Sequence, residues 1–256
     1  MKIGIVGCMG RVGQLLVKGI QSGKYPDLEL SGGTIKPDEN YPDQGYPIYK
    51  DPNELFENTD CVIDFTIPEA TRKHIWLAAK HKTSLIIGTT GLTENDECEM
   101  KDAAKETSII YAANMSVGVN LLCALIEQAA SRLDEEFDIE IVETHHKHKI
   151  DAPSGTALAM GKSAAKGREV NHEEKAVYER YGRTGERKSG DIGYGVLRGG
   201  DVVGEHTMFF YGEGERIELT HKATDRSLFA KGALKAASWI NGKEAGLYSM
   251  RDVLDL

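Results

Sequence analysis

The chain has 256 residues, of which 40% are hydrophobic, and its 31 basic and 40 acidic residues give a net charge of −9. That length suffices for one large or two modest domains with a buried core, and the composition excludes a disordered protein. No apolar run approaches the roughly 20 residues of a membrane-spanning helix. The negative charge disfavours non-specific binding to nucleic acid, although a local basic cluster can still bind an anionic small molecule.

The N-terminus and the cysteines bear on location. The first residues, MKIGIVGCMG, enter a strand-like run at once and lack the apolar region and cleavage site of a signal peptide. The cysteines lie far apart and form no C-x-x-C pair, which fits reduced thiols better than a disulfide framework or a zinc site. They are Cys8, Cys61, Cys98 and Cys123. We therefore expect a cytoplasmic protein.

The first half of the chain alternates strand and helix patterns. An Ile- and Val-rich run at 2–7 predicts a strand, and after a glycine turn the pattern of residues 12–23 predicts a helix. Further strands are predicted at 28–35, 61–65, 84–88 and 109–112, and a further helix at 69–81. This alternation predicts parallel βαβ units, and the continuous apolar runs indicate strands that are covered on both faces.

The pattern changes after Asn114. Helices are predicted at 119–133, 157–166 and 228–240, and strands at 137–144, 202–211 and 216–222, the last two paired antiparallel across 212–214. Residues 180–200 are rich in glycine, arginine and charge, which predicts a long surface loop. The sequence thus predicts a nucleotide-binding domain followed by a mixed α+β domain.

Three glycines, Gly7, Gly10 and Gly13, lie between the first strand and the first helix. Glycine lets the backbone turn sharply and approach a pyrophosphate, and the helix N-terminus offers free N–H groups to the phosphates. The spacing is G-x-x-G-x-x-G rather than the common G-x-G-x-x-G, so a turn that uses glycine only for packing stays open as an alternative. The position of the turn in a βαβ unit favours dinucleotide binding.

The end of the second strand bears on which dinucleotide is bound. An acid at this position normally binds the adenosine ribose hydroxyls. Here Ile35 and Lys36 stand at this point, and no acid occurs before Asp38. Lys36 is a candidate partner for a 2′-phosphate, and an ordinary solvated lysine is the alternative.

The densest chemical segment is ETHHKHKIDAPSGTA at 143–157. Histidines exchange protons near neutral pH, and lysines bind carboxylates or donate protons. Ser154 is a candidate N-cap of the helix that follows, whose free N–H groups would suit a substrate carboxylate. The segment therefore places proton donors beside an anion site.

Other interpretations of this segment stay open. His145, His146 and His148 could bind a metal ion in a metal-dependent hydrolase, although neither an HExxH spacing nor a nearby cysteine supports this. The run could also be a solvated polar loop. A non-catalytic NAD(P)-sensing protein is consistent with the first domain, but it leaves the cluster without a purpose.

Segments along almost the whole chain together resemble the 4-hydroxy-tetrahydrodipicolinate reductase (dihydrodipicolinate reductase) family. They are GCMGRVG at 7–13, DFTIPEAT at 64–71, GTTG at 88–91, AANMSVGVN at 112–120, ETHHKHKIDAPSGTA at 143–157, RGGDVVGEH at 198–206 and FAKGAL at 229–234. The histidine–lysine segment followed by DAPSGTA is the most diagnostic. The resemblance implies an oxidoreductase that reduces 4-hydroxy-tetrahydrodipicolinate to tetrahydrodipicolinate with NADPH and/or NADH, in lysine and diaminopimelate biosynthesis.

The resemblance also implies roles for particular residues. His145 and Lys149 match the family's catalytic acid positions, and His146, Gly155 and Thr156 match its substrate-binding positions. The implied cofactor-binding residues, together with Lys36, are Gly7, Cys8, Met9, Gly10, Arg11, Val12, Gly88, Thr89, Thr90, Ala112, Ala113, Asn114 and Met115. No residue matches a metal-binding position.

The implied fold is α/β, with a Rossmann-like doubly wound parallel sheet in residues 1–116 and 227–256. Residues 117–226 would form an α+β mixed-sheet domain that binds the substrate and builds a homotetramer, with neither nucleic acid nor membrane as a partner. Two departures matter. Ile35 and Lys36 stand where family members often have an acid followed by a base, which disfavours strong NADH use, and Val12 replaces the usual methionine.

Overall fold

The computed structural model describes residues 1–36, 39–41 and 43–256. The chain divides into two units, one formed by Met1–Val117 with Ser227–Leu256 and the other by Gly118–Arg226. The division expected from the sequence places the first junction one residue earlier. Within the described residues, no helix is long and apolar enough to cross a membrane.

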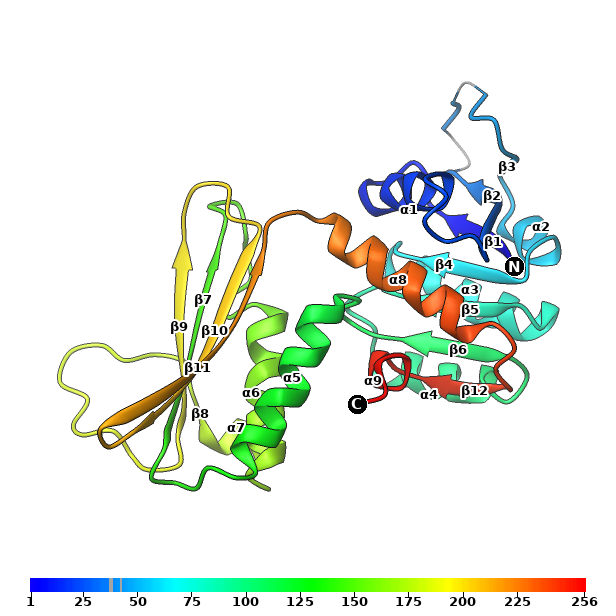
Figure 1. Ribbon diagram of the computed structural model, residues 1–256. Helices are drawn as coiled ribbons and strands as arrows, with labels where there is room; N and C mark the ends of the chain where they lie inside the picture. Colours follow the sequence, from blue (N-terminus) through cyan, green and yellow to red (C-terminus); the bar gives the residue numbers. More distant parts are fainter. Residues whose placement is uncertain (37–38, 42) are drawn as a thin grey trace. The chain divides into compact units, whose positions relative to one another are not determined.

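The first unit is built on a seven-stranded parallel sheet with the order β12-β6-β5-β4-β1-β2-β3 (Figure 1). Its strands are β1 (Lys2–Val6), β2 (Glu29–Thr34), β3 (Ile48–Tyr49), β4 (Cys61–Asp64), β5 (Ser84–Ile87), β6 (Ser108–Tyr111) and β12 (Gly246–Tyr248). The chain runs from β1 to one side and then returns to β4 on the other side. This reversal creates a topological switch point between β1 and β4, and ligands of open α/β sheets bind outside the carboxyl ends of the strands at such a point.

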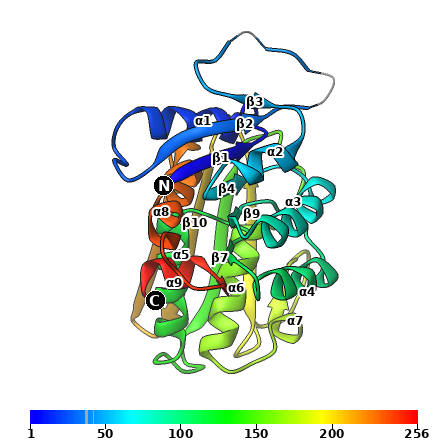
Figure 2. The same cartoon turned by 90° about the vertical axis from the view of Figure 1, so that its right-hand side faces the viewer.

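Helices cover both faces of this sheet (Figure 2). The helices α1 (Arg11–Gln21), α8 (Ser227–Ile240) and α9 (Met250–Leu254) bury one face, and α2 (Pro52–Glu57), α3 (Pro68–His81) and α4 (Glu94–Ala103) bury the other. The central strands are therefore mostly apolar where they face a helix, as their continuous apolar runs predicted, and Asp64 at the end of β4 is an exception. The doubly wound architecture expected from the sequence is confirmed.

The second unit holds a five-stranded mixed sheet with the order β11-β10-β7-β9-β8. Its strands are β7 (Asp138–His145), β8 (Ala176–Val177), β9 (Ile192–Arg198), β10 (Gly204–Gly212) and β11 (Glu215–Ala223). The long helices α5 (Val117–Ala130) and α6 (Gly155–Gly167) pack on one face, and α7 (His172–Lys175) is a single short turn. Residues of β7 alternate between buried and half-buried, which confirms the predicted half-solvated strand.

The prediction of a surface loop over 180–200 is wrong for its second half. Residues Ile192–Arg198 form β9, which pairs with both β7 and β8 inside the sheet. Gly193 and Gly195 made this segment resemble a loop, because glycine is rare inside strands. Gly193 pairs with Glu140 of β7, and a Cβ at Gly193 would overlap the Glu140 carboxylate. The helix α4 was also not predicted, because only Asp96, Met100 and Ala103 of its residues are buried.

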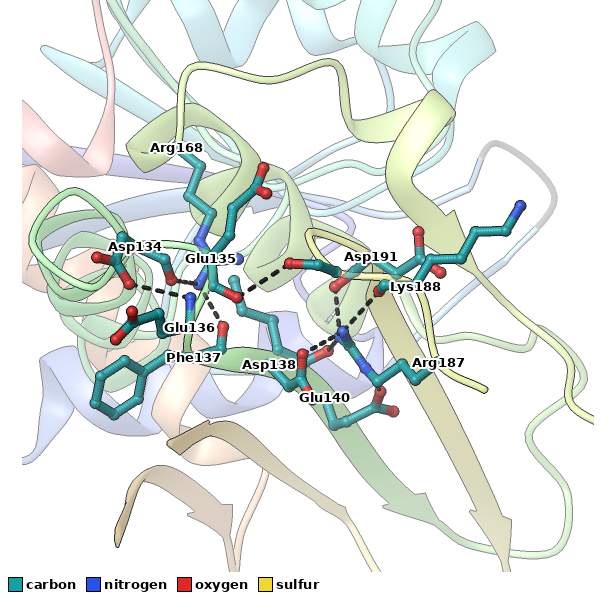
Figure 3. Close-up of polar contacts among 12 residues, drawn as sticks. Asp134, Glu135, Glu136, Phe137, Asp138, Glu140, Arg168, Arg187, Lys188 and Asp191 are labelled. Carbon is teal, nitrogen blue, oxygen red and sulfur yellow. Dashed lines mark hydrogen bonds and ion pairs between the residues drawn. The ribbon is translucent and has the colours of Figure 1, made fainter. Parts of the chain in front are cut away.

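Arginines anchor the loop between β8 and β9 to strand β7, and Figure 3 shows the contacts of Arg187. The Arg187 guanidinium donates to Asp138 Oδ1 at 2.6 Å, to Glu140 Oε1 at 3.0 Å and to the backbone oxygens of Ile139 and Asp191 at 3.0 and 2.6 Å. Arg180 adds two hydrogen bonds of 2.8 Å to Glu140. Burial alone would raise the pKa of Glu140, but the two arginines lower it. The Glu140 carboxylate is therefore a fixed, charged group beside Gly193.

We expect Gly193→Ala to reduce the free energy of unfolding by about 1–3 kcal/mol, the usual range for overpacking. The added methyl group would overlap a carboxylate that two arginines hold in place. Gly195→Ala is the matched control on the same strand, because its nearest neighbour would be Val142 Cγ2 at an ordinary 3.4 Å. Urea unfolding of both variants measures the difference, and equal losses would contradict this account of β9.

Candidate functional site

The glycine turn follows β1 at the switch point of the first unit. Gly7 has a φ of +67°, which favours glycine, and a Cβ on Gly13 would overlap the Gly7 carbonyl oxygen. The Gly10 N–H donates to the same oxygen at 2.9 Å. Helix α1 then begins at Arg11 without a side-chain cap, so its first N–H groups lie beside the turn. Backbone conformation accounts for Gly7 and packing for Gly13, and the helix start without a side-chain cap has the geometry that can receive an anion.

The end of β2 lies against this turn. Thr34 Oγ1 accepts a hydrogen bond from Gly7 N at 3.1 Å, and the Thr34 carbonyl accepts one from Cys8 N at 3.0 Å. Ile35 is buried in the core, whereas Lys36 is exposed and lies 3.6 Å from Glu39 Oε1. Asp38, the next acid in the sequence, lies outside the described residues. A carboxylate beside Lys36 was not foreseen, and it partly neutralises the candidate 2′-phosphate partner.

The expected nicotinamide-side residues follow the carboxyl ends of β5 and β6. Thr90 and Ala113 are exposed, and Ala112 and Asn114 are half-buried. Thr89 and Met115, by contrast, have buried side chains. These two residues can present only backbone atoms to a ligand. A Cβ on Gly88 would overlap the Phe65 ring, so Gly88 allows the loops after β4 and β5 to approach closely.

In the second unit, a buried carboxylate organises the end of β7. Glu143 and His145 are two residues apart and therefore lie on the same face of the strand. His145 Nδ1 lies 2.5 Å from Glu143 Oε2, and the Ser154 N–H donates to Glu143 Oε1 at 3.0 Å. Arg198 at the end of β9 donates to both oxygens, at 2.8 and 2.9 Å. The bidentate arginine is the strongest contact of its kind for a carboxylate.

This network keeps Glu143 ionised. The carboxyl group is buried, which by itself would raise its pKa. Hydrogen bonds from Arg198, His145 and Ser154 N outweigh burial and lower the pKa. The negatively charged Glu143 carboxylate beside Nδ1 of His145 fixes the orientation of the ring. Nε2 is then the ring nitrogen that can exchange a proton with a ligand.

A second buried histidine lies beside the first. His206 of β10 meets the His145 ring edge to face, with ring centroids 5.0 Å apart, and its Nε2 lies 2.9 Å from Ser154 Oγ. Burial lowers the pKa of His206 to about 4, with a further contribution from His145. His206 is therefore neutral at physiological pH. His206 thus links the His145 ring to Ser154. Ser154 is the N-cap of α6, as predicted, because its Oγ accepts a hydrogen bond from Ala157 N at 3.2 Å.

The other predicted residues lie in the segment that leads into α6 and on the first turn of this helix. His146 Nε2 lies 3.5 Å from Arg226, and its buried Nδ1 has no hydrogen-bond partner among the residues that the structure describes. Lys149 Nζ donates to Asp151 Oδ1 at 2.8 Å. Gly155 is the first residue of α6, and apart from its chain neighbours and the backbone of its own helix no described residue comes within 4 Å of where its Cβ would be. Thr156 follows it on the first turn. The helix start is open where the resemblance predicts a substrate carboxylate.

The metal hypothesis gains no support. β7 ends at His145, so His146 and His148 lie in a turn and do not share a strand face. Within residues 1–36, 39–41 and 43–256, no group of three His, Cys, Asp or Glu side chains is arranged to hold a metal ion.

Sequence reasoning did not assign Glu143, Arg198 or His206 to the site. Glu143 carried one usable signal, since it precedes His145 by two residues on a strand predicted to be half-buried. Arg198 and His206 are the two ends of the family-like segment at 198–206, but that segment gave neither residue a role, because each reaches the site through sheet pairing with a distant part of the chain.

A doubly wound sheet with a glycine turn at its switch point defines the class of dinucleotide-binding α/β proteins, here with a second unit that carries titratable groups beside an open helix start. Comparison with known proteins identifies the family. The model for "Dihydrodipicolinate reductase, N-terminus" matches residues 1–115, and the model for its C-terminus matches residues 118–254. The chain belongs to the dihydrodipicolinate reductase family.

Relatives agree with this assignment, and solved structures share the fold. The 4-hydroxy-tetrahydrodipicolinate reductases of Acinetobacter baumannii and Afipia carboxidovorans are 44% and 46% identical to the chain, over 100% of it and 96% and 97% of their own lengths. Dipicolinate-bound dihydrodipicolinate reductase from Paenisporosarcina sp. TG-14 has a TM-score of 0.81 at 23% identity, with 97% of each chain covered. A probable dehydrogenase from Thermotoga maritima shares the fold, with a TM-score of 0.64 at 14% identity over 99% of this chain and 92% of its own.

The depressed pKa of His206 predicts an acid-sensitive fold. The unfolded chain takes up a proton at this histidine below pH 6.5, whereas the folded protein does so only near pH 4. Stability from the neutral ring is therefore complete above pH 6.5 and is lost as pH falls toward 4, by at most roughly 1.4 kcal/mol per pH unit. In urea unfolding at pH 7, 5.5 and 4.5, we expect His206→Gln to lose less stability on acidification than the wild type. Parallel losses would contradict this assignment.

Proposed function

We propose that this chain reduces 4-hydroxy-tetrahydrodipicolinate to tetrahydrodipicolinate with NAD(P)H, as a step of lysine and diaminopimelate biosynthesis. Full-length relatives that carry this activity in their names support the proposal, as do the two family models. The observation that carries it is the arrangement at the end of β7, where His145 is held by a buried carboxylate beside the open start of α6. That arrangement suits proton transfer to a bound anion.

The first unit binds the cofactor. The turn from Gly7 to Val12 and the start of α1 receive the pyrophosphate, and the loops after β5 and β6 border the nicotinamide. Lys36 and Arg11 lie on the surface of this unit and can approach a 2′-phosphate. The bound cofactor supplies the hydride.

The second unit binds the substrate and supplies the proton. The start of α6 at Gly155 and Thr156 receives one carboxylate of the substrate, and His146 and Lys149 add polar and cationic contacts. The reduction takes up one hydride and one proton and releases the hydroxyl group as water. His145 delivers the proton from Nε2, because Glu143 holds its other nitrogen. Lys149, held by Asp151, stabilises negative charge or shares the delivery of the proton.

We also propose a cytoplasmic homotetramer that associates through the second unit. Phe209 and Tyr211 stack 5.3 Å apart on the face of the sheet opposite α5 and α6, and Leu197 is exposed on the same face. Strand β11 is an edge of the sheet. Association would cover both the apolar face and the edge. Light scattering at micromolar concentration measures the mass, and a monomer would contradict the proposal.

The direct test of the function is loss of NADPH absorbance on addition of 4-hydroxy-tetrahydrodipicolinate, measured with and without a chelator. We expect turnover in both conditions, since no residue of the proposed site requires a metal ion. The proposed reaction would be contradicted if neither NADPH nor NADH supported turnover. Loss of turnover on addition of the chelator would contradict the proposal that the reaction needs no metal ion.

We expect His145→Gln to lower kcat by roughly 10²- to 10⁴-fold, the usual contribution of a positioned acid. The affinity for NADPH should stay within about twofold, because His145 belongs to the second unit, whereas single-turnover rates should fall with kcat. Steady-state kinetics and a fluorescence titration with NADPH measure the two effects. His148→Gln is the matched control, as His148 is exposed in the same segment. Wild-type turnover in His145→Gln would remove this residue from the proton transfer.

We expect the enzyme to use NADPH at least as well as NADH, with less than about a hundredfold preference, because an exposed lysine contributes little by itself. Lys36→Ala should lower the ratio of kcat/KM for NADPH over NADH. Glu39→Gln should raise it, since Glu39 lies 3.6 Å from the Lys36 ammonium. If the wild type strongly prefers NADH, or both variants keep the wild-type ratio, Lys36 is only a surface lysine.

A further inference from the structure

A buried carboxylate at the end of β4 has no role in the chemistry described so far. Asp64 is fully buried at the carboxyl end of this central strand. Its Oδ1 accepts from the Thr66 N–H at 2.8 Å and the Thr66 hydroxyl at 2.6 Å. Its Oδ2 lies 2.8 Å from both Thr71 Oγ1 and His74 Nδ1. Both oxygens of this buried carboxylate are therefore satisfied, by the loop after β4 and by helix α3.

The group is charged despite its burial. Burial alone would raise the pKa of Asp64, but the hydrogen bond and charge of His74, together with the bonds from Thr66 and Thr71, lower it. An apolar group of similar volume would often stabilise a core as well as a buried, hydrogen-bonded carboxylate does. The network therefore calls for an explanation beyond stability, and its position at the cofactor edge of the sheet suggests one.

The Asp64 network joins the loops that border the cofactor site. Thr89 Oγ1, in the loop after β5, lies 2.9 Å from Thr71 Oγ1 and 3.3 Å from Asp64 Oδ1. The Asp64 carbonyl accepts from Gly88 N at 2.8 Å. On the other side, Thr66 Cγ2 is the neighbour that a Cβ on Gly7 would meet, at 3.2 Å. One carboxylate thus sets the spacing between the glycine turn and the loop of Gly88–Thr90.

We infer that Asp64 and His74 are positioning residues for the nicotinamide half of the cofactor. The pair holds Thr66 and Thr89 by their hydroxyls, so that the backbone of Gly88–Thr90 faces the ligand at a fixed distance from the pyrophosphate turn. This explains why the Thr89 side chain is turned away from the ligand. The inference rests on the proposed function only for the identity of the cofactor, and binding measurements test it without the substrate.

Two ligands separate this role from a general contribution to stability. NADPH engages both halves of the site, whereas 2′-phospho-ADP-ribose lacks the nicotinamide and engages only the turn and the ribose phosphate region. We expect Asp64→Asn to weaken NADPH binding at least tenfold and kcat/KM by roughly a hundredfold, the cost of about 1 Å of misplacement. Affinity for 2′-phospho-ADP-ribose should stay within about twofold of the wild type. The inference would be overturned if Asp64→Asn weakened the binding of both ligands equally, or weakened the binding of neither.

Variants of His74 keep the test decisive if Asp64→Asn does not fold. The ring stacks on Phe56 with centroids 5.9 Å apart, so His74→Phe keeps the packing and removes the donor to Asp64. His74→Asn places an amide N–H near the position of Nδ1. We therefore expect His74→Phe to weaken NADPH binding relative to 2′-phospho-ADP-ribose, and His74→Asn to keep the wild-type ratio of the two affinities. Rescue by the asparagine and not by the phenylalanine supports positioning, whereas identical behaviour of the two variants contradicts it.

Thr83→Val is the matched control for loss of a buried hydroxyl. Thr83 precedes β5 at the opposite end of the sheet, where its hydroxyl donates to the Phe56 carbonyl at 2.8 Å. This variant should lose thermal stability and keep the wild-type ratio of the two ligand affinities. A selective loss of NADPH binding in Thr83→Val would show that general destabilisation produces the effect, and would overturn the inference. Failure of substrate turnover in a wild type that shows the predicted binding pattern would contradict the proposed reaction alone.

Discussion

The ionised Glu143 carboxylate is the interaction on which the second unit's site depends. Burying an unpaired charge is costly, so the group requires several donors. They come from three places that only the folded sheet brings together: Arg198 of β9, His145 of β7 and the Ser154 N–H before α6. The same contacts orient the His145 ring and fix the start of the helix proposed to hold the substrate carboxylate. Loss of this charge would therefore disturb the proposed proton donor and the proposed anion site together.

In the first unit a different buried carboxylate, Asp64, holds the loops at the end of the sheet. Its strand order brings the carboxyl ends of β1, β4 and β5 together at the switch point, where a ligand must be met by loops. Loops are the most mobile parts of such a fold, and accurate positioning requires that they be tied to the sheet. Asp64 provides this connection through hydroxyls and backbone N–H groups. In both units a buried carboxylate at the end of a strand holds the loops beside the proposed site.

Much of this organisation could be predicted from the sequence, because the signals were local. The apolar runs of β1, β4, β5 and β6 predicted the parallel sheet, and the alternation of polar and apolar residues in β7 predicted a half-solvated strand. The segment at 143–157 indicated proton transfer beside a helix start. The strand β9 was missed since Gly193 and Gly195 fit a loop by composition, and only their pairing with β7 requires small residues. Arg198 could not be assigned because it meets Glu143 across 55 residues of sequence.

The central claim is that Glu143 acts through His145 as one unit of proton delivery. A double-mutant cycle of kcat with His145→Gln and Glu143→Gln tests it most directly, since residues that act as a unit give losses far from additive. We predict that each single variant is strongly impaired and that the double variant is about as slow as His145→Gln alone. Losses that multiply in the double variant would show that Glu143 contributes independently of His145 and would contradict the account.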